Sequence, residues 1–176
     1  MNVPDNPKTA VDSTHGYTPL HAAAWHGNLG AAAALLKQGA NVQARESKWH
    51  GTPAGWAAYA GHEETRNLIA QGPIDIMEAV DFGRKERIAE IIAADVRSLN
   101  RPFSSYPIYP LYCEGWYTPL AWAAIKGDVE TVRFLIGHGA DVSVRSPEAK
   151  RLHEIVSHKG HAEIASLLKG DFERSV

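Results

Sequence analysis

Apolar residues between positions 16 and 44 recur with the spacing of two short helices joined by a turn. Thr18 can cap the first helix through its hydroxyl group, and Pro19 stands at the first helical position, where its missing N–H costs nothing. Gly27 and Gly39 are placed to end the two helices, because glycine adopts the left-handed conformation cheaply. One helix pair of this size cannot bury its own apolar faces, so the pattern predicts neighbours of the same kind.

The glycine that ends each first helix recurs along the chain, at Gly27, Gly61, Gly83, Gly127 and Gly160. Successive glycines are separated by 34, 22, 44 and 33 residues. The two irregular intervals together span 66 residues, which is twice 33. A period near 33 therefore runs through the chain, with one segment shortened by 11 residues and the next lengthened by 11.

The residues around these glycines resemble the ankyrin repeat family, whose unit is a β-turn followed by two antiparallel helices. The matching motifs are Thr18-Pro19-Leu20-His21, Thr52-Pro53, Thr118-Pro119-Leu120 and the segment from Leu135 to Val142. The resemblance implies an all-α ankyrin-repeat solenoid of stacked helix-turn-helix units with short β-hairpin fingers. From the family pattern, His21 is expected to hydrogen-bond across its Thr-Pro turn and to be structural.

Five repeats are expected in a single array over residues 12–170, with the third and fifth degenerate. Their approximate bounds are 12–44, 45–73, 74–100, 114–144 and 145–170, with a long aromatic loop at 101–113. Residues 1–11 are polar with two prolines and are expected to form a flexible N-terminal tail, and residues 171–176 a C-terminal tail. The polar outer face of the fifth repeat is typical of a terminal repeat.

The array departs from its period after Gly72-Pro73-Ile74. Asp75 and Glu78 have the spacing of a capping box, which predicts that a new helix starts at once and that the finger between repeats two and three is missing. The following connection is correspondingly long and holds prolines and aromatic residues. We hypothesise that residues 102–113 fold over the gap left by the missing finger.

Tyrosine and tryptophan side chains gather at the positions where ankyrin proteins usually bind their partners, namely the finger tips and the ends of the first helices. These residue types are common interface hot spots. The positions carried over from the family, together with the loop tyrosines, are Tyr17, Trp25, His26, Trp49, His50, Tyr59, Asp81, Phe82, Tyr106, Tyr109, Tyr112, Trp116, Tyr117, Ile125, Lys126 and His158. For each single residue the alternative is packing between repeats or beneath the loop.

Trp56 and Trp122 precede the paired alanines of their helices. Because that position faces the neighbouring repeat, both side chains are expected to pack in the core.

Composition and charge exclude several classes of function. Hydrophobic residues make up 44% and charged residues 22%, as in an ordinary soluble domain. The formal net charge of −2 does not indicate binding to nucleic acid or to an anionic membrane. No apolar run approaches the length of a membrane span. Cys113, as the single cysteine, excludes an internal disulfide and a cysteine-based zinc site. A cytoplasmic location is expected.

Metal and catalytic motifs are weak. His153 and His158 are five residues apart, one more than a helical zinc pair needs to share a face, and His161 adds no evident third ligand. Asp81-Phe82-Gly83 matches a kinase magnesium motif by chance, because the other kinase motifs are missing. We therefore predict no catalytic residue, no metal and no cofactor.

The sequence favours a non-enzymatic protein–protein interaction module, an adaptor or a stoichiometric inhibitor, that binds through the aromatic concave face and the 102–113 loop. One alternative is a small-molecule-binding protein with a pocket under that loop. A less favoured alternative is a metal site or enzyme built from histidine and glutamate between His153 and His161.

Overall fold

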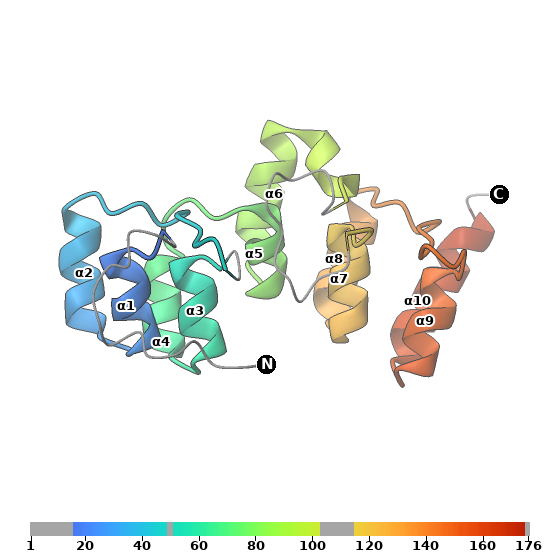
Figure 1. Cartoon of the computed structure of the whole chain (residues 1–176). Coiled ribbons are helices and arrows are strands. Elements are labelled where there is room, and N and C mark those ends of the chain that lie inside the picture. Colours follow the sequence, from blue (N-terminus) through green and yellow to red (C-terminus); the bar gives the residue numbers. More distant parts are fainter. Residues whose placement is uncertain (1–15, 49–50, 103–114, 175–176) are drawn as a thin grey trace. The chain divides into compact units, whose positions relative to one another are not determined.

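The computed structural model describes residues 16–48, 51–102 and 115–174 (Figure 1). The predicted N-terminal tail and nearly all of the 101–113 connection lie outside these ranges. Contacts between Cα atoms divide the chain into two compact units, Met1–Ile74 (unit 1) and Asp75–Val176 (unit 2), which are described separately below. No helix among the described residues is long and apolar enough to cross a membrane.

Unit 1 consists of two helix pairs in its described part. The elements are α1 (Pro19–Trp25), α2 (Leu29–Lys37), α3 (Pro53–Tyr59) and α4 (Glu63–Ile69). The first helices α1 and α3 pack against each other, and the second helices α2 and α4 do the same. The helices are thus stacked pair on pair, as the sequence predicts.

Unit 2 continues the same order of helix pairs. The elements are α5 (Ile76–Asp81), α6 (Lys85–Ala94), the 3-10 helix η1 (Val96–Asn100), α7 (Pro119–Lys126), α8 (Val129–Gly137), α9 (Leu152–His158) and α10 (Ala162–Arg174). The first helix α7 contacts α5 on one side and α9 on the other. α10 runs to Arg174, so most of the predicted C-terminal tail is helical. The all-α fold predicted from the sequence is confirmed.

The first helices begin at the predicted caps. The hydroxyl oxygens of Thr18, Thr52 and Thr118 accept hydrogen bonds from the backbone N–H three residues further on, at 3.4, 3.0 and 3.2 Å. Proline follows each threonine at a position that needs no N–H donor. Asp75 caps α5 with bonds of 2.9 Å from the N–H groups of Met77 and Glu78, so a helix does start directly after Ile74.

Small residues form the core between neighbouring first helices. Ala24, Ala57 and Ala124 are fully buried, which lets the helix backbones approach closely. Larger side chains fill the space toward the second helices, where Leu20, Leu120 and Leu135 are also fully buried. The core therefore lies both between neighbouring first helices and between the two helices of each pair.

The fingers close through hydrogen bonds of tight turns, and the described residues contain no regular strand. In the finger before α3, the Glu46 N–H donates to the Gly51 carbonyl, and the fully buried Glu46 carboxylate accepts from the N–H groups of Lys48 and Gly51. In the finger before α9, an isolated antiparallel bridge joins Arg145 and Arg151. The fingers are thus hairpin-like turns held by side-chain clamps.

His21 joins the first helix pair to the finger before the second. Its Nδ1 accepts a hydrogen bond from the Thr18 N–H at 3.2 Å, so its Nε2 carries the proton and donates to the Gly51 carbonyl at 3.1 Å. Burial lowers the pKa of His21 below its ordinary value of 6.5, against the opposing effects of the Gly51 carbonyl and the Glu46 charge. The structural role expected for His21 is confirmed.

We predict that His21 makes unit 1 less stable in acid. The unfolded chain takes up a proton on this ring near pH 6.5, whereas the folded chain resists it because a protonated Nδ1 would face the Thr18 N–H donor. The free energy of unfolding should therefore be fully retained above about pH 7 and fall as the pH drops below about 6.5. Urea unfolding followed by tryptophan fluorescence should show a steeper acid loss for the wild type than for His21→Gln.

The exposed His26 supplies the matched control for this experiment, because His26→Gln should leave the pH profile of unfolding as in the wild type. Equal profiles for the wild type and His21→Gln would contradict the prediction.

A second histidine contact recurs at an interval of 99 to 100 residues. Gly27 and Gly127 both have positive φ angles, of 62° and 81°, and each lies against a histidine ring, His62 and His161 respectively. A Cβ atom added at either glycine would lie 2.6 Å from the ring. The His161 ring is also tied through Nε2 to the Ile125 carbonyl at 3.2 Å. Glycine is thus required at these positions for both backbone and packing reasons.

Gly127→Ala is predicted to destabilise unit 2 more than Gly139→Ala does. Gly139 has a similar φ of 87° with nothing within 4 Å of an added Cβ, so its substitution costs only backbone strain, about 1–2 kcal/mol. Gly127→Ala adds the displacement of His161 from its bond to Ile125. Urea denaturation monitored by circular dichroism measures both, and equal losses would contradict the role assigned to His161.

Candidate functional site

An aromatic cluster lies on the first helices of unit 1 and at the turn before them. It consists of Tyr17, His21, Trp25, Trp56 and Tyr59, and we call it the unit 1 aromatic cluster. Trp56 is at its centre, with ring centroids 5.0 Å from Tyr17, 5.5 Å from His21 and 5.6 Å from Trp25, all edge-to-face. Tyr59 stacks on Trp25 at 6.2 Å with an angle of 19° between the ring planes.

Burial separates the members of this cluster into a base and an exposed platform. Trp56 is only 7% exposed, which confirms that it packs in the core between α1 and α3. Tyr59 is 57% exposed, and Trp25 beneath it is half-buried. The cluster therefore presents a stacked Trp–Tyr pair on a rigid buried support, which is a ready contact surface for an apolar or cationic group.

The finger before α3 helps to position this support. A Cβ atom at Gly51 would lie 2.5 Å from Nε1 of Trp56, so glycine lets the indole lie directly against the finger backbone. The Gly51 carbonyl in turn accepts the bond from His21. This contact is visible only in the folded unit.

A second cluster in unit 2 combines aromatic rings with an ion pair. It consists of Asp81, Trp116, Tyr117, Trp122 and Lys126, and we call it the unit 2 polar–aromatic cluster. Tyr117 lies edge-on to Trp116 at 4.6 Å and stacks on Trp122 at 5.9 Å. With 8% exposure, Tyr117 is the buried member of the three.

Asp81 connects the polar members of this second cluster. Its Oδ1 accepts hydrogen bonds from the Lys126 ammonium group at 2.6 Å and from the Trp122 indole N–H at 3.2 Å. The Lys126 Nζ also donates to the Asp81 carbonyl oxygen at 2.9 Å and lies 5.7 Å from the centroid of the Trp122 ring. Trp122 was expected to be a core residue, but it is half-buried, and its N–H donates to this carboxylate.

The two clusters occupy the same register of the repeat. Trp56 and Trp122 each come four residues after the capping threonine of their helix. Each is contacted from the preceding first helix by the residue two positions before its closing glycine, which is Trp25 in unit 1 and Asp81 in unit 2. The position two residues before the closing glycine therefore carries an aromatic ring in unit 1 and a carboxylate in unit 2, each in contact with the tryptophan of the next first helix.

Other predicted site residues lie near helix ends. His26 is exposed and Phe82 is half-buried, each at the C-cap of its first helix. The exposed His158 is bonded through Nδ1 to the Glu154 carbonyl at 2.7 Å. Five further predicted positions lie outside the described residues: Trp49, His50, Tyr106, Tyr109 and Tyr112. The assignment of all these residues to a partner-binding face stays a prediction.

No metal site can be built from the described side chains. Within residues 16–48, 51–102 and 115–170, no group of three or more histidine, cysteine, aspartate or glutamate residues could hold a metal ion. In the C-terminal cluster, His158 is bonded to its own helix and His161 to the Ile125 carbonyl of α7.

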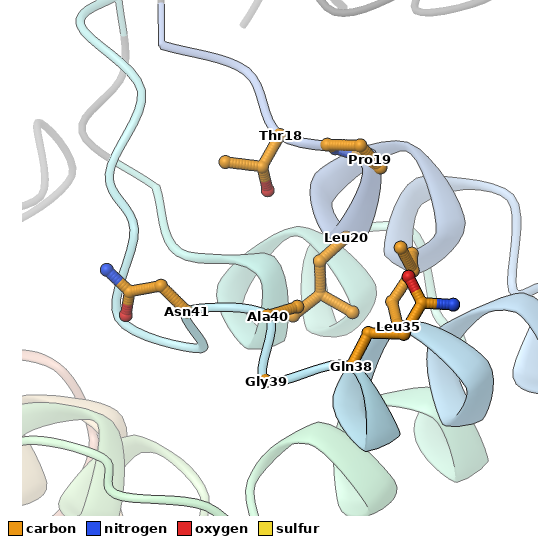
Figure 2. A pocket seen from close by; sticks show the side chains of 8 residues that line it. All are labelled: Thr18, Pro19, Leu20, Leu35, Gln38, Gly39, Ala40 and Asn41. Carbon is orange, nitrogen blue, oxygen red and sulfur yellow. The ribbon is translucent and has the colours of Figure 1, made fainter.

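A pocket that the sequence did not reveal lies in unit 1, between the start of α1 and the end of α2 (Figure 2). Its volume is about 310 Å³. The lining residues are uncharged: Thr18, Pro19, Leu20, Leu35, Gln38, Gly39, Ala40 and Asn41. None of them belongs to the unit 1 aromatic cluster.

Comparison with known families supports an ankyrin-repeat protein. The ankyrin repeat family model matches residues 15–47 and 116–147, which contain the Thr18 and Thr118 turns. The number of repeats and the degenerate third and fifth repeats stay predictions. No curated protein matches this sequence.

A solved structure has a similar fold. It is described as the Bd0816 predatory endopeptidase from Bdellovibrio bacteriovorus in complex with immunity protein Bd3460. One of its chains aligns with a TM-score of 0.62 and 22% sequence identity, over 92% of this chain and 83% of that chain. At this identity the likeness concerns the fold alone.

The unit 1 aromatic cluster has a buried support and an exposed platform. We therefore predict that substitutions in the two parts lower the free energy of unfolding by very different amounts. Trp56→Ala should lower the free energy of unfolding by about 3–5 kcal/mol, because it leaves a cavity between α1 and α3. Tyr59→Ala should cost about 1 kcal/mol or less, the worth of one exposed aromatic pair. Chemical denaturation measures both, and comparable losses would show that Tyr59 is part of the core.

Proposed function

We propose that this chain is a non-enzymatic binding module that recognises another protein through the ends of its first helices. The observation that carries the proposal is the stacked pair of Trp25 and the 57% exposed Tyr59 on the buried Trp56. A rigid aromatic platform loses little side-chain entropy on binding. More of the free energy gained by burying its rings therefore remains as binding free energy.

The unit 2 polar–aromatic cluster is proposed as a second contact surface with different chemistry. Asp81 and Lys126 neutralise each other at 2.6 Å, and their side chains are 22% and 34% exposed. Such a pair can give a partner both a donor and an acceptor without leaving a charge uncompensated. The proposed partner therefore presents an apolar contact to unit 1 and polar groups to unit 2.

The similar fold supports an inhibitory or adaptor role by analogy. The solved structure described above contains an enzyme together with an immunity protein, so this architecture occurs in an enzyme–protein complex. Occlusion of a partner's surface in a one-to-one complex requires no catalytic group in the module. The pocket proposed from the sequence under residues 102–113 lies outside the described residues, and we do not favour it over a protein partner.

The test is quantitative affinity capture from the native source with the full chain as bait, followed by titration of the purified candidate partner. Tyr59→Ala and Trp25→Ala should each weaken the candidate's affinity at least tenfold, about 1.4 kcal/mol or more, because they remove the exposed platform. Trp116→Ala should weaken binding at unit 2 in the same way.

Val96→Ala is the matched control, because Val96 is a large, exposed apolar residue that belongs to neither cluster and lies on η1. It should retain wild-type affinity. A partner bound equally well by the wild type and by all three aromatic variants would contradict the proposed face.

A further inference from the structure

The chain contains two copies of the same local structure, related by an offset of 100 residues. Thr18, Pro19 and Leu20 correspond to Thr118, Pro119 and Leu120. Leu35, Gly39 and Ala40 correspond in the same way to Leu135, Gly139 and Ala140. Six of the eight residues that line the pocket of unit 1 thus recur unchanged in unit 2, and Gln38 and Asn41 are replaced there by His138 and Asp141.

These equivalent residues differ in burial. In unit 2, Thr118, Pro119 and Ala140 are all buried. In unit 1, Pro19 is exposed, and Thr18 and Ala40 are only half-buried. The surface that forms an open pocket in unit 1 is therefore covered in unit 2.

The 3-10 helix η1 contributes to that cover. It packs against α7, and its Leu99 is only 2% exposed. The next residue, Asn100, accepts a hydrogen bond through Oδ1 from the N–H of Asp141 at 2.8 Å. Asp141 is the counterpart of Asn41, which lines the pocket of unit 1. The occupant of this surface in unit 2 is thus a short turn that pairs a buried leucine with a side-chain carboxamide.

We propose that the unit 1 pocket is a docking site for a turn of another protein with the same chemistry, an apolar side chain followed by asparagine or glutamine. The pocket is complementary to such an uncharged pair, because none of its eight lining side chains carries a charge (Figure 2). The leucine-like side chain fills the space over Leu20 and Ala40, and the carboxamide oxygen accepts from the backbone N–H of Asn41. A charged side chain at the first position is excluded by the cost of desolvation, because the equivalent Leu99 is buried.

The chain itself supplies the probe for a test. A peptide of residues 95–100 with blocked termini contains Leu99, Asn100 and the Asp95 cap, whose Oδ1 accepts from the Arg97 N–H at 3.1 Å. Titrated into the ¹⁵N-labelled full chain, it should shift the amide resonances of Gly39, Ala40 and Asn41 in a saturable way. The amides of Gly139 and Asp141 should stay unchanged, because η1 already occupies that site.

Matched variants test the contacts one by one. Leu99→Ala in the peptide should reduce affinity about tenfold or more, the expected effect of losing one buried leucine side chain. Ala40→Arg in the full chain should block the pocket and reduce binding at least as much. Ala34→Arg, at an exposed position on α2 that does not line the pocket, should bind as the wild type does. Dispersed amide spectra of both variants establish that they are folded.

Three outcomes would overturn the proposal. The first is the absence of saturable shifts at Gly39–Asn41, and the second is equal binding to Ala40→Arg and the wild type. The third is a shift of these amides with protein concentration alone, which would assign the pocket to a second copy of the chain. The aromatic variants Tyr59→Ala and Trp25→Ala should leave peptide binding intact, so this proposal and the proposed function can fail independently.

Discussion

The fold depends on the burial of small, apolar helix faces between successive helix pairs. The first helices have only six to eight residues, and helices of this length are marginal in isolation. They are stabilised because the fully buried alanines Ala24, Ala57 and Ala124 allow neighbouring backbones to approach closely. The aromatic clusters, which join one first helix to the next, require this stacking to be in place.

Histidine rings strengthen the stacking by crossing from one element to another. His21 reaches the Gly51 carbonyl of the next finger, and His161 reaches the Ile125 carbonyl of the preceding pair. The His161 ring bonds to a carbonyl at the end of α7, whereas the His21 ring adds a second bond to a carbonyl that already accepts from the Glu46 N–H. The glycines at Gly27 and Gly127 make room for the second kind of contact. These ties fix the ends of the first helices, where the candidate binding residues lie.

The two units use one architecture for two kinds of surface. At the same register, Trp25 packs edge-on against Trp56 in unit 1, whereas Asp81 accepts a hydrogen bond from the Trp122 N–H in unit 2. The turns and core residues of a repeat maintain its backbone structure. The exposed positions can therefore differ between repeats without loss of the fold. The open pocket of unit 1 and its covered counterpart in unit 2 are a second instance of this variation.

The sequence by itself determined the helix pairs, their caps and their order. Helix starts are indicated by the capping side chains of Thr18, Thr52, Thr118 and Asp75. Each bonds to a backbone N–H only two or three residues further on, so this signal depends on local sequence. It also placed the aromatic residues at the ends of the first helices and predicted that Trp56 is buried. These inferences needed only periodicity and residue type.

Only the tertiary structure decided which of these side chains are supports and which are surface. Trp122 has the same repeat position as the buried Trp56, yet it is half-buried, and its N–H donates to the carboxylate of Asp81 on the preceding first helix. The pocket beside Thr18 likewise depends on contact between the start of α1 and the end of α2, and the burial of Glu46 and the close approach at Gly51 are seen only in the folded chain. Periodicity specifies which face of a helix is turned inward, whereas the neighbour that meets that face is specified only by the folded chain.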